Sequence, residues 1–305
     1  MRIRRLSLRN FRSYAAADVE LGPGVTIVTG RNGVGKTNLL DAIYFGCTGH
    51  SARTTNEREL VRFGERVVRV TVATEADDGP HELHVGLEPG EPKRMTVDGV
   101  RVERLLDAPG RPLVSVFLPD RLELVKGTPS LRRAHVDQLV TALWPARSAT
   151  RRAYAQALGQ RNALLGRIRS GAASVASLSA WDGELARHGV ALMADRAAAV
   201  AAVAEGFASR AVELGLDGDP AVAYRPRSRA TEAAGLAGEL AERRDRDLER
   251  GFTEHGPHRD DLALTRDGRE LRAYGSQGQQ RLALLALLLA ERDAIAATRD
   301  AIPVM

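Results

Sequence analysis

One glycine-rich segment near the amino terminus has the composition and spacing of a phosphate-binding loop. It matches the pattern G-x-x-x-x-G-K-[ST] at every fixed position and consists of Gly30, Arg31, Asn32, Gly33, Val34, Gly35, Lys36 and Thr37. In such a loop the backbone N–H groups surround the β-phosphate, the lysine adds a cation beside the β and γ phosphates, and the threonine hydroxyl ligates Mg²⁺. We therefore predict that these residues bind ATP and that Thr37 is a magnesium ligand.

A second polar loop comes directly before a leucine-rich segment near the carboxyl end. It consists of Ser276, Gln277, Gly278, Gln279, Gln280 and Arg281. A small, flexible loop at a helix amino terminus can bind an anion, and in a dimer it could close over the γ-phosphate of the partner's nucleotide. The alternative is a capping box, in which Ser276 caps the helix and Gln279 reaches back. Beside a phosphate-binding loop, we favour the nucleotide contact.

The segments around the first loop predict the elements that position it. Val25 to Thr29 is a short β-branched run, which is typical of a buried strand, and Thr37 to Phe45 has helical spacing. A strand before the loop and a helix after it form the context that the motif requires. The alternative, a glycine turn beside an unrelated lysine, needs a chance match in a chain with only three lysines.

The rest of the first third of the chain also predicts strands. The alternation in Arg2 to Arg9 is compatible with an edge strand. Val67 to Val102 is rich in Val and Thr and is interrupted by turn residues, so antiparallel hairpins are expected there. Leu113 to Leu118 is another apolar strand, which Pro119 ends.

The character of the chain changes after about Pro129. Residues 131–250 are rich in Ala and Arg with few β-branched residues, which predicts long helices with breaks at 170–179 and 215–229. From Gly251 the α/β character returns, with a hairpin turn at Asp267-Gly268, a helix over 281–294 and the start of a buried strand at 301–305. We interpret 131–250 as a helical arm inserted into the first domain, although a separate all-α domain fits the periodicity equally.

The predicted fold is therefore α/β, a P-loop ABC-type ATPase head with a mixed sheet and helices, and with an inserted helical lobe. The head would consist of residues 1–130 and 251–305, and the lobe of residues 131–250. The chain has 305 residues, a formal net charge of +5 and a single cysteine, Cys47. The mild basic charge favours polyanionic partners, although a high-GC coding bias would also explain the excess of arginine over lysine. Neither a signal core nor a membrane-spanning apolar run is present, so we expect a cytoplasmic protein.

Several segments together resemble the RecF family, in the SMC-like branch of ABC-type ATPases. The matching segments follow the family's order and are Leu8 to Tyr14, Gly30 to Asn38, Phe117 to Gly127 with Pro129, Arg132, Arg133 and Asp137 after it, Gly256 to Leu262, and Ser276 to Arg281. The segment Gly256-Pro257-His258-Arg259-Asp260-Asp261-Leu262 is close to diagnostic of the family. The resemblance covers the chain from its first residues to its last helix.

The resemblance implies an ATPase that dimerises head to head when it binds ATP. It implies that the dimer binds single-stranded DNA, duplex DNA and gap junctions, and that it acts with RecO and RecR in replication, gap repair and the SOS response by helping to load recombinase. Residue by residue, it implies that Gly30 to Thr37 bind ATP and Mg²⁺, and that Ser276, Gly278 and Gln279 contact the partner's nucleotide. Arg12 and Ser13 are expected to lie near the nucleotide.

The sequence departs from the family pattern at its carboxyl end. The family continues past Pro303-Val304 into an apolar strand with paired acidic residues, the Walker B motif, but this sequence stops at Met305. Walker B carboxylates orient Mg²⁺ and the attacking water. We therefore identify no catalytic residue here, and expect this polypeptide to bind ATP rather than hydrolyse it.

Two other classes of protein, a P-loop kinase and an SMC-like rod, remain as alternatives. A metal site is not favoured. A P-loop kinase needs an acceptor pocket and a lid arginine on a compact core, and an SMC-like rod needs long heptad runs that residues 131–250 lack. His255 and His258 lie beside Asp260 and Asp261, but Gly256-Pro257 forbids the regular helix that would bring the histidines together as metal ligands.

Overall fold

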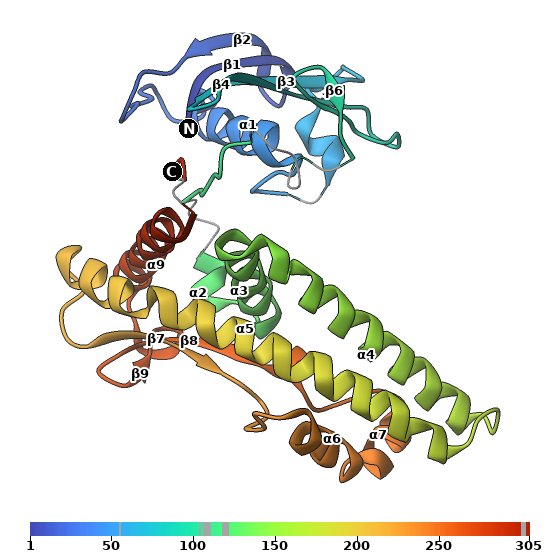
Figure 1. The fold of residues 1–305 in the computed structure, drawn as a ribbon. Helices are drawn as coiled ribbons and strands as arrows, with labels where there is room; N and C mark the ends of the chain where they lie inside the picture. Colours follow the sequence, from blue (N-terminus) through green and yellow to red (C-terminus); the bar gives the residue numbers. More distant parts are fainter. Residues whose placement is uncertain (55, 104, 106–110, 118–121, 300–302) are drawn as a thin grey trace. The chain divides into compact units, whose positions relative to one another are not determined.

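The computed structural model describes residues 1–54, 56–103, 105, 111–117, 122–299 and 303–305. The chain forms two compact units (Figure 1). The first unit contains Met1–Leu118 and Asp300–Met305, and the second contains Pro119–Arg299. Among the described residues, no helix is long and apolar enough to cross a membrane. The three-part division expected from the sequence stays a prediction, because these contacts group residues 251–299 with the helices of the second unit.

The first unit is built on a sheet in which all neighbouring strands are antiparallel. The strand order is β2-β1-β3-β4-β5-β6. The bounds are β1 (Arg2–Phe11), β2 (Tyr14–Glu20), β3 (Val68–Ala76), β4 (Gly79–Leu87), β5 (Arg94–Val97) and β6 (Val100–Arg101). The hairpins predicted for residues 67–102 are therefore confirmed. Arg2 to Arg9 does form a strand, but the expected edge position is wrong, because β1 lies between β2 and β3.

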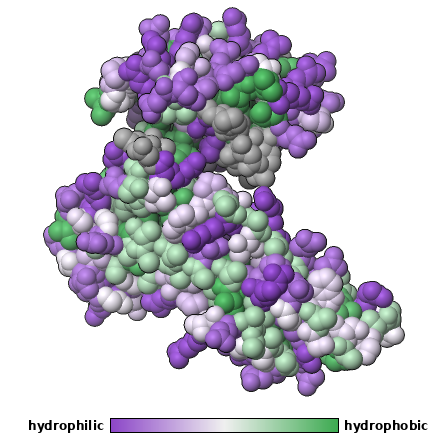
Figure 2. All heavy atoms as spheres, viewed as in Figure 1, coloured by the Kyte–Doolittle hydropathy of each residue, from purple (hydrophilic) through white to green (hydrophobic). Residues whose placement is uncertain are grey.

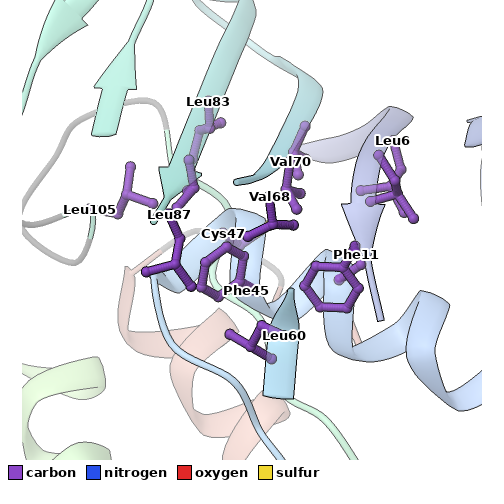
Figure 3. Packing of buried hydrophobic residues seen from close by; sticks show 14 of the residues in the cluster. Leu6, Phe11, Phe45, Cys47, Leu60, Val68, Val70, Leu83, Leu87 and Leu105 are labelled. Carbon is purple, nitrogen blue, oxygen red and sulfur yellow. The ribbon is translucent and has the colours of Figure 1, made fainter. Parts of the chain in front are cut away.

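The strand register aligns the apolar side chains on one face of this sheet. Leu8 pairs with Val70, Val70 with Val85 and Val85 with Met95, so one buried row crosses four strands. Helix α1 (Lys36–Thr48) covers this face, and its Phe45 lies 5.9 Å from Phe11 between ring centroids (Figure 3). Hydrophilic side chains gather on the face of this unit that is in view in Figure 2. The alternation in the strands thus separates a packed face from a solvated one.

The prediction of a buried strand at Val25 to Thr29 is wrong. Val25 is 90% exposed and Ile27 is 78% exposed, and these residues have no strand assignment. A buried strand of this kind needs neighbours that share its backbone hydrogen bonds, and none of the described residues forms such a bond with it. Local composition therefore favoured a strand that lacks a pairing partner within the described chain.

The two other predicted strands of this unit meet in a single bridge. Val304 pairs in parallel with Val114, and its backbone N–H donates to the Leu113 carbonyl at 2.7 Å while its carbonyl accepts from the Ser115 N–H at 2.8 Å. Leu118 and residues 301–302, which belong to the same predictions, lie outside the described residues. The described parts of both segments are thus paired, but neither forms a regular strand.

The second unit is mainly helical, as the sequence predicts for residues 131–250. Its helices are α2 (Glu123–Lys126), α3 (Pro129–Leu143), α4 (Ser148–Arg169), α5 (Leu178–Glu213), α6 (Ala233–Ala241), α7 (Arg244–Arg250), α8 (Leu271–Tyr274) and α9 (Gln277–Arg299). Helix α4 packs along α5, and α9 packs against α5 (Figure 1). Helix α9 begins earlier and ends later than the expected 281–294, since its capping residues and its last turns are also helical.

A small sheet with the order β7-β8-β9 completes the second unit. Its strands are β7 (Pro220–Arg225), β8 (Asp261–Arg266) and β9 (Arg269–Glu270). The hairpin predicted around Asp267-Gly268 is confirmed as β8–β9. The sequence pattern predicts its second run as Glu270, Leu271 and Arg272, but Leu271 and Arg272 lie in the short helix α8. The break expected at 215–229 contains β7, which pairs with β8 more than 35 residues away along the chain. Such pairing is set by a distant segment and is invisible to local composition.

Gly46 offers a test of the α1–β3 contact. A Cβ atom at this position would come within 2.5 Å of Val72 Cγ2 and 2.8 Å of Val70 Cγ1. We expect Gly46→Ala to cost about 2 kcal/mol of stability, because both valines lie in a packed core. Gly159→Ala is the matched control, since nothing lies within 4 Å of its Cβ position on α4.

The measurement is thermal unfolding of the two variants beside the parent chain. The control should be neutral or stabilising by up to about 1 kcal/mol, because alanine is the better helix former. Equal melting temperatures for the Gly46→Ala variant and the parent chain would show that α1 does not pack on β3 as described.

Candidate nucleotide-binding site

The predicted phosphate-binding loop forms a tight turn that leads into α1. Gly35 has a φ of 111° and lies at the cap of the helix without a side-chain hydrogen bond. A Cβ atom there would lie 3.0 Å from Ser13 Oγ, so glycine is required both by the backbone angle and by the space. The amino end of α1 therefore presents unshielded backbone N–H groups, which is the feature that binds phosphate.

Lys36 closes the loop on itself. Its Nζ donates to the Gly30 carbonyl at 2.7 Å and to the Arg31 carbonyl at 2.9 Å. Arg31 to Val34 and Thr37 are exposed, and within the loop the Val34 N–H donates to the Arg31 carbonyl at 3.3 Å. The residues fit a magnesium nucleotide, because a cation, a row of amide donors and a hydroxyl ligand meet at one helix terminus. The structure thus brings together all eight residues that the motif predicts.

The corner between β1 and β2 supports this loop from behind. Tyr14 Oη donates to the Gly35 carbonyl at 3.2 Å, and Asn38 Nδ2 donates to Ser13 Oγ at 2.9 Å. Asn10 and Arg12 have φ values of 55° and 49°, which non-glycine residues adopt rarely and mostly at constrained sites. Ser13 thus lies beside the loop, next to Gly35 and Asn38, and its predicted position near the nucleotide stays a prediction.

Arg12 is held by a buried carboxylate of α1. Its Nε donates to Asp41 Oδ2 at 2.9 Å, and the Arg12 side chain is only 14% exposed. Asp41 is fully buried and also accepts from Ser51 Oγ at 2.8 Å and from the Ala52 N–H at 2.9 Å. A nucleotide contact by Arg12 stays a prediction, since the described contacts of its guanidinium are to Asp41 and Ser51. Sequence reasoning missed Asp41, although an acid on the apolar face of a helix was a usable signal.

The second polar loop forms the capping box that was weighed as the alternative. Ser276 Oγ accepts from the Gln279 N–H at 3.2 Å, and Gln279 Oε1 accepts from the Ser276 N–H at 2.9 Å. Gln280 is buried and donates to the carbonyls of Leu271 and Gly275. Ser276 and Gly278 remain exposed at the amino end of α9. A capped helix terminus with exposed small residues is still able to meet an anion, so the partner-nucleotide role stays a prediction.

The segment Gly256 to Leu262 is a structural junction of the second unit. The buried Asp260 carboxylate accepts from Tyr224 Oη, from the Arg227 N–H at 2.7 Å and from Arg196 at 3.3 Å. Burial raises the pKa of Asp260, and these donors oppose the shift. The neighbouring Asp261 forms a two-pronged ion pair with Arg132 at 2.6 and 2.9 Å, and this hydrogen bonding lowers its pKa against the opposing effect of burial.

His255 and His258 are engaged in hydrogen bonds to different groups. His258 Nε2 lies 2.9 Å from the Thr253 carbonyl, so it donates, and Nδ1 accepts from Tyr154 Oη at 2.7 Å. Burial lowers the pKa of His258 to about 4, with Arg259 and Arg133 acting in the same direction. His255 instead contacts Glu239 at 2.5 Å. Within the described residues, no group of three or more His, Cys, Asp and Glu side chains is placed to hold a metal ion.

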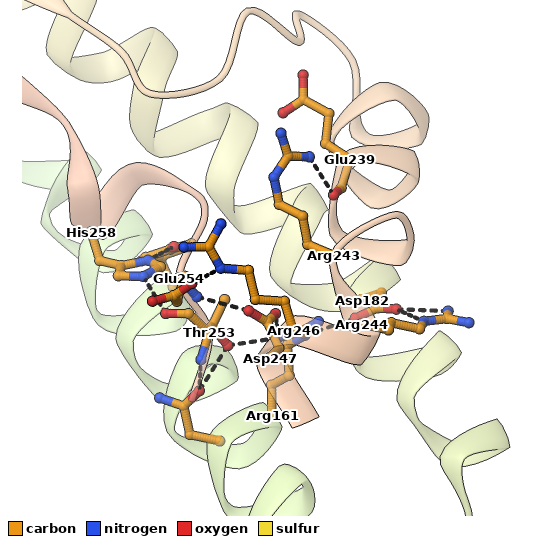
Figure 4. A network of polar contacts seen from close by, with 12 residues as sticks. Arg161, Asp182, Glu239, Arg243, Arg244, Arg246, Asp247, Thr253, Glu254 and His258 are labelled. Atoms are coloured by element: carbon orange, nitrogen blue, oxygen red, sulfur yellow. Dashed lines mark hydrogen bonds and ion pairs between the residues drawn. The ribbon is translucent and has the colours of Figure 1, made fainter. Parts of the chain in front are cut away.

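A buried ion network holds α4, α5 and α7 together beside this segment (Figure 4). Arg161 is fully buried and donates to Asp182 at 2.7 Å, to Asp247 at 2.6 Å and to Thr253 Oγ1 at 2.7 Å. Arg244 adds a second cation to Asp182 at 2.7 Å. Since a buried charge must be paired, one guanidinium fixes three elements at once.

The phosphate loop at the start of α1 and the mixed strands and helices define a P-loop ATPase-type fold. Residues 5–103 match the family model for the AAA domain. The chain is 26% identical to a solved structure of the recombination mediator protein RecF with ATP in the RecFOR pathway, with a TM-score of 0.89 over 99% of this chain and 83% of that one. At 16% identity, the Smc head domain from Pyrococcus furiosus has a TM-score of 0.53 over 98% of this chain, which shows a shared fold alone.

Curated relatives identify the family. The chain is 38% identical to the DNA replication and repair protein RecF of Heliobacterium modesticaldum, over 95% of this chain and 80% of that protein. It is also 38% identical to the RecF of Myxococcus xanthus, over 100% of this chain and 82% of that protein. The chain belongs to the RecF family of DNA replication and repair proteins, and the resemblance found in its motifs is confirmed.

The Arg12–Asp41 pair predicts a large effect of a small change. Asp41→Ala removes the buried acceptor of three donors and leaves the guanidinium of Arg12 unpaired, so we expect a loss of about 3 kcal/mol. Asp18→Ala removes an exposed ion pair with Arg5 and should leave stability nearly unchanged. Urea unfolding of both variants measures the difference, and similar midpoints would contradict the proposed support of α1.

The neutral His258 predicts a specific dependence of stability on pH. Because its pKa is about 4 in the folded chain and about 6.5 when unfolded, its contribution is complete above pH 6.5 and is lost as pH falls from 6.5 to 4. We expect this histidine to account for a loss of at most about 3 kcal/mol over that range. His258→Gln should lower stability at pH 8 but flatten the decline below pH 6.5, as measured by urea unfolding at each pH. Parallel pH profiles for the two proteins would rule out a neutral buried His258.

Proposed function

We propose that this chain is an ATP-controlled DNA-binding protein that acts in DNA replication, in the repair of gaps and in the SOS response. The observation that carries the proposal is the loop of Gly30 to Thr37, which Lys36 closes and which presents free backbone N–H groups at the start of α1. In support, related RecF structures contain ATP. A cytoplasmic location accords with this role.

Each group in the loop would bind a different part of the magnesium nucleotide. The amides of the loop hold the phosphates, Lys36 exchanges its carbonyl partners for phosphate oxygens, and the Thr37 hydroxyl ligates Mg²⁺. The bound cation would neutralise phosphate charge. Arg12 lies behind the loop on Asp41, from which its free guanidinium edge could reach a nucleotide.

ATP would act as a switch by joining two copies of the chain. Ser276, Gly278 and Gln279 are proposed to contact the γ-phosphate of the partner's nucleotide, because they lie at the positive end of the α9 dipole. The dimer would then bind single-stranded DNA, duplex DNA and gap junctions. RecR, with RecO in the same pathway, is the proposed protein partner, in keeping with the RecFOR pathway of the related structures.

The two rival classes of protein make different demands on the same loop. A P-loop kinase would transfer phosphate to a small molecule and would not need DNA. A rod would depend on long heptads, whereas α4 and α5 join through a short connection and pack on each other. DNA binding that depends on ATP separates the proposed function from both.

Lys36→Ala provides the test of the proposed function. We expect the parent chain to bind a fluorescent ATP analogue with Mg²⁺, and the variant to lose at least tenfold in affinity because the phosphate cation is gone. ATP should also roughly double the mass of the parent chain in sedimentation and strengthen its binding to a labelled gapped duplex. Neither effect should occur in the variant.

Two controls make the outcome decisive. Lys126→Ala removes one of the few other lysines and should bind the analogue like the parent chain. If DNA binding is the same with and without ATP, and the same in Lys36→Ala, the proposal that ATP controls DNA binding is wrong. Transfer of phosphate to a small acceptor would favour the kinase.

A further inference from the structure

Three arginines from separate segments gather around the buried Asp260. Arg133 of α3 donates from Nη1 to the Asp260 carbonyl at 2.8 Å, and the backbone N–H of Arg227 donates to the Asp260 carboxylate at 2.7 Å. Arg259 directly precedes Asp260 in the chain. No carboxylate of the described residues forms an ion pair with any of the three.

The nearby carboxylates form ion pairs with other arginines. Asp137 pairs with Arg196 at 2.7 and 3.1 Å, and the Asp260 carboxylate faces that same arginine in the interior. Asp261 is taken by Arg132. The interior charges of this region are therefore neutralised in pairs. In the part of the chain that the structure describes, Arg133, Arg227 and Arg259 are the arginines around Asp260 that have no carboxylate partner.

The charges of Arg133 and Arg259 lie close enough to repel each other. Burial, together with the charges of Arg196 and Arg259, lowers the pKa of Arg133, but a guanidinium stays protonated at neutral pH. Arg133 uses one of its five N–H donors for the Asp260 carbonyl, which fixes its direction and leaves the others free. An anion at this surface would relieve the repulsion and would meet a donor that is already oriented.

An exposed aromatic ring lies beside Arg259. Phe252 is 39% exposed, and the guanidinium carbon of Arg259 lies 5.8 Å from the centre of its ring. Arginines that bind phosphates, with an aromatic ring on which a base can stack, are the combination that proteins use to bind nucleic acid strands.

We propose that Arg133 and Arg259, flanked by Arg227, form a surface that binds the phosphodiester backbone of DNA. This inference rests on the proposed function, because it presupposes that the chain binds DNA. It assigns a second role to the segment Gly256 to Leu262, whose buried Asp260 and half-buried Asp261 hold the second unit together. The Asp260 carbonyl thereby orients Arg133 toward the DNA, while the Asp260 carboxylate pairs with Arg196 in the interior.

The double variant Arg133→Gln/Arg259→Gln tests the surface in the full chain. Binding to a fluorescein-labelled duplex and to a labelled single strand is measured by anisotropy with ATP and Mg²⁺ over a range of NaCl concentrations. We expect weaker binding at every salt concentration, and for the duplex a slope of log K against log [NaCl] that is smaller in magnitude by about two. Binding of the fluorescent ATP analogue should be unchanged.

Arg151→Gln/Arg152→Gln is the matched control, since it removes the same charge from two exposed arginines of α4. It should keep nearly the affinity and salt slope of the parent chain. The single variant Arg259→Gln breaks no side-chain hydrogen bond among the described residues and loses only the contact with Phe252, so it tests the surface with little effect on the fold. An unchanged salt slope in the Arg133/Arg259 variant, or an equal loss in the control, would overturn the proposal.

Failure of the proposed function has a different signature. If the parent chain does not bind DNA with or without ATP, both the DNA-binding function and this surface fall. If the parent chain binds DNA and the Arg133/Arg259 variant binds it equally well, only the assignment of this surface to DNA is rejected. An acidic protein partner for these arginines would give that second result.

Discussion

The fold of the second unit is organised around one buried carboxylate, that of Asp260, which needs hydrogen-bond donors. Asp260 has no exposed surface, so its charge has to be met by donors within the chain. Those donors come from α5, from the end of β7 and from the loop that follows β7, through Arg196, Tyr224 and Arg227. Asp137 then binds the other edge of Arg196 and brings in α3. Three separate stretches of chain are thus fixed around one residue.

The first unit solves the same physical problem at the nucleotide loop. Asp41 is buried in α1 and is satisfied by Arg12, Ser51 and the backbone of Ala52. The strained backbone at Arg12 is explained by this pairing, because the β1–β2 corner has to turn the guanidinium toward α1. The phosphate loop is therefore held from both sides, by its own lysine and by the corner behind it.

Some of this arrangement could be predicted from the sequence because the relevant spacing is local. Gly30 to Thr37 and α1 follow from a motif of contiguous residues, and the capping box follows from Ser276 and Gln279 three positions apart. That Val25 to Thr29 find no strand partner among the described residues, and that β7 forms, could not be predicted, since each depends on whether a distant segment pairs with it. The ion pairs of Asp260 and Asp41 join residues far apart in sequence, and no periodicity marks them.

The excess of arginine over lysine, which a coding bias would also produce, has a structural use in this fold. Arg161 binds two carboxylates and a threonine hydroxyl at once, and Arg132 and Arg196 each grip a carboxylate with two nitrogens. A lysine is a single point charge and could not form these two-pronged contacts. Because these interior arginines pair with the nearby acids, the surface arginines around Asp260 form no ion pair with a carboxylate among the described residues. The positive surface that we assign to DNA is therefore a consequence of how the interior is neutralised, and it does not require a large net charge on the chain.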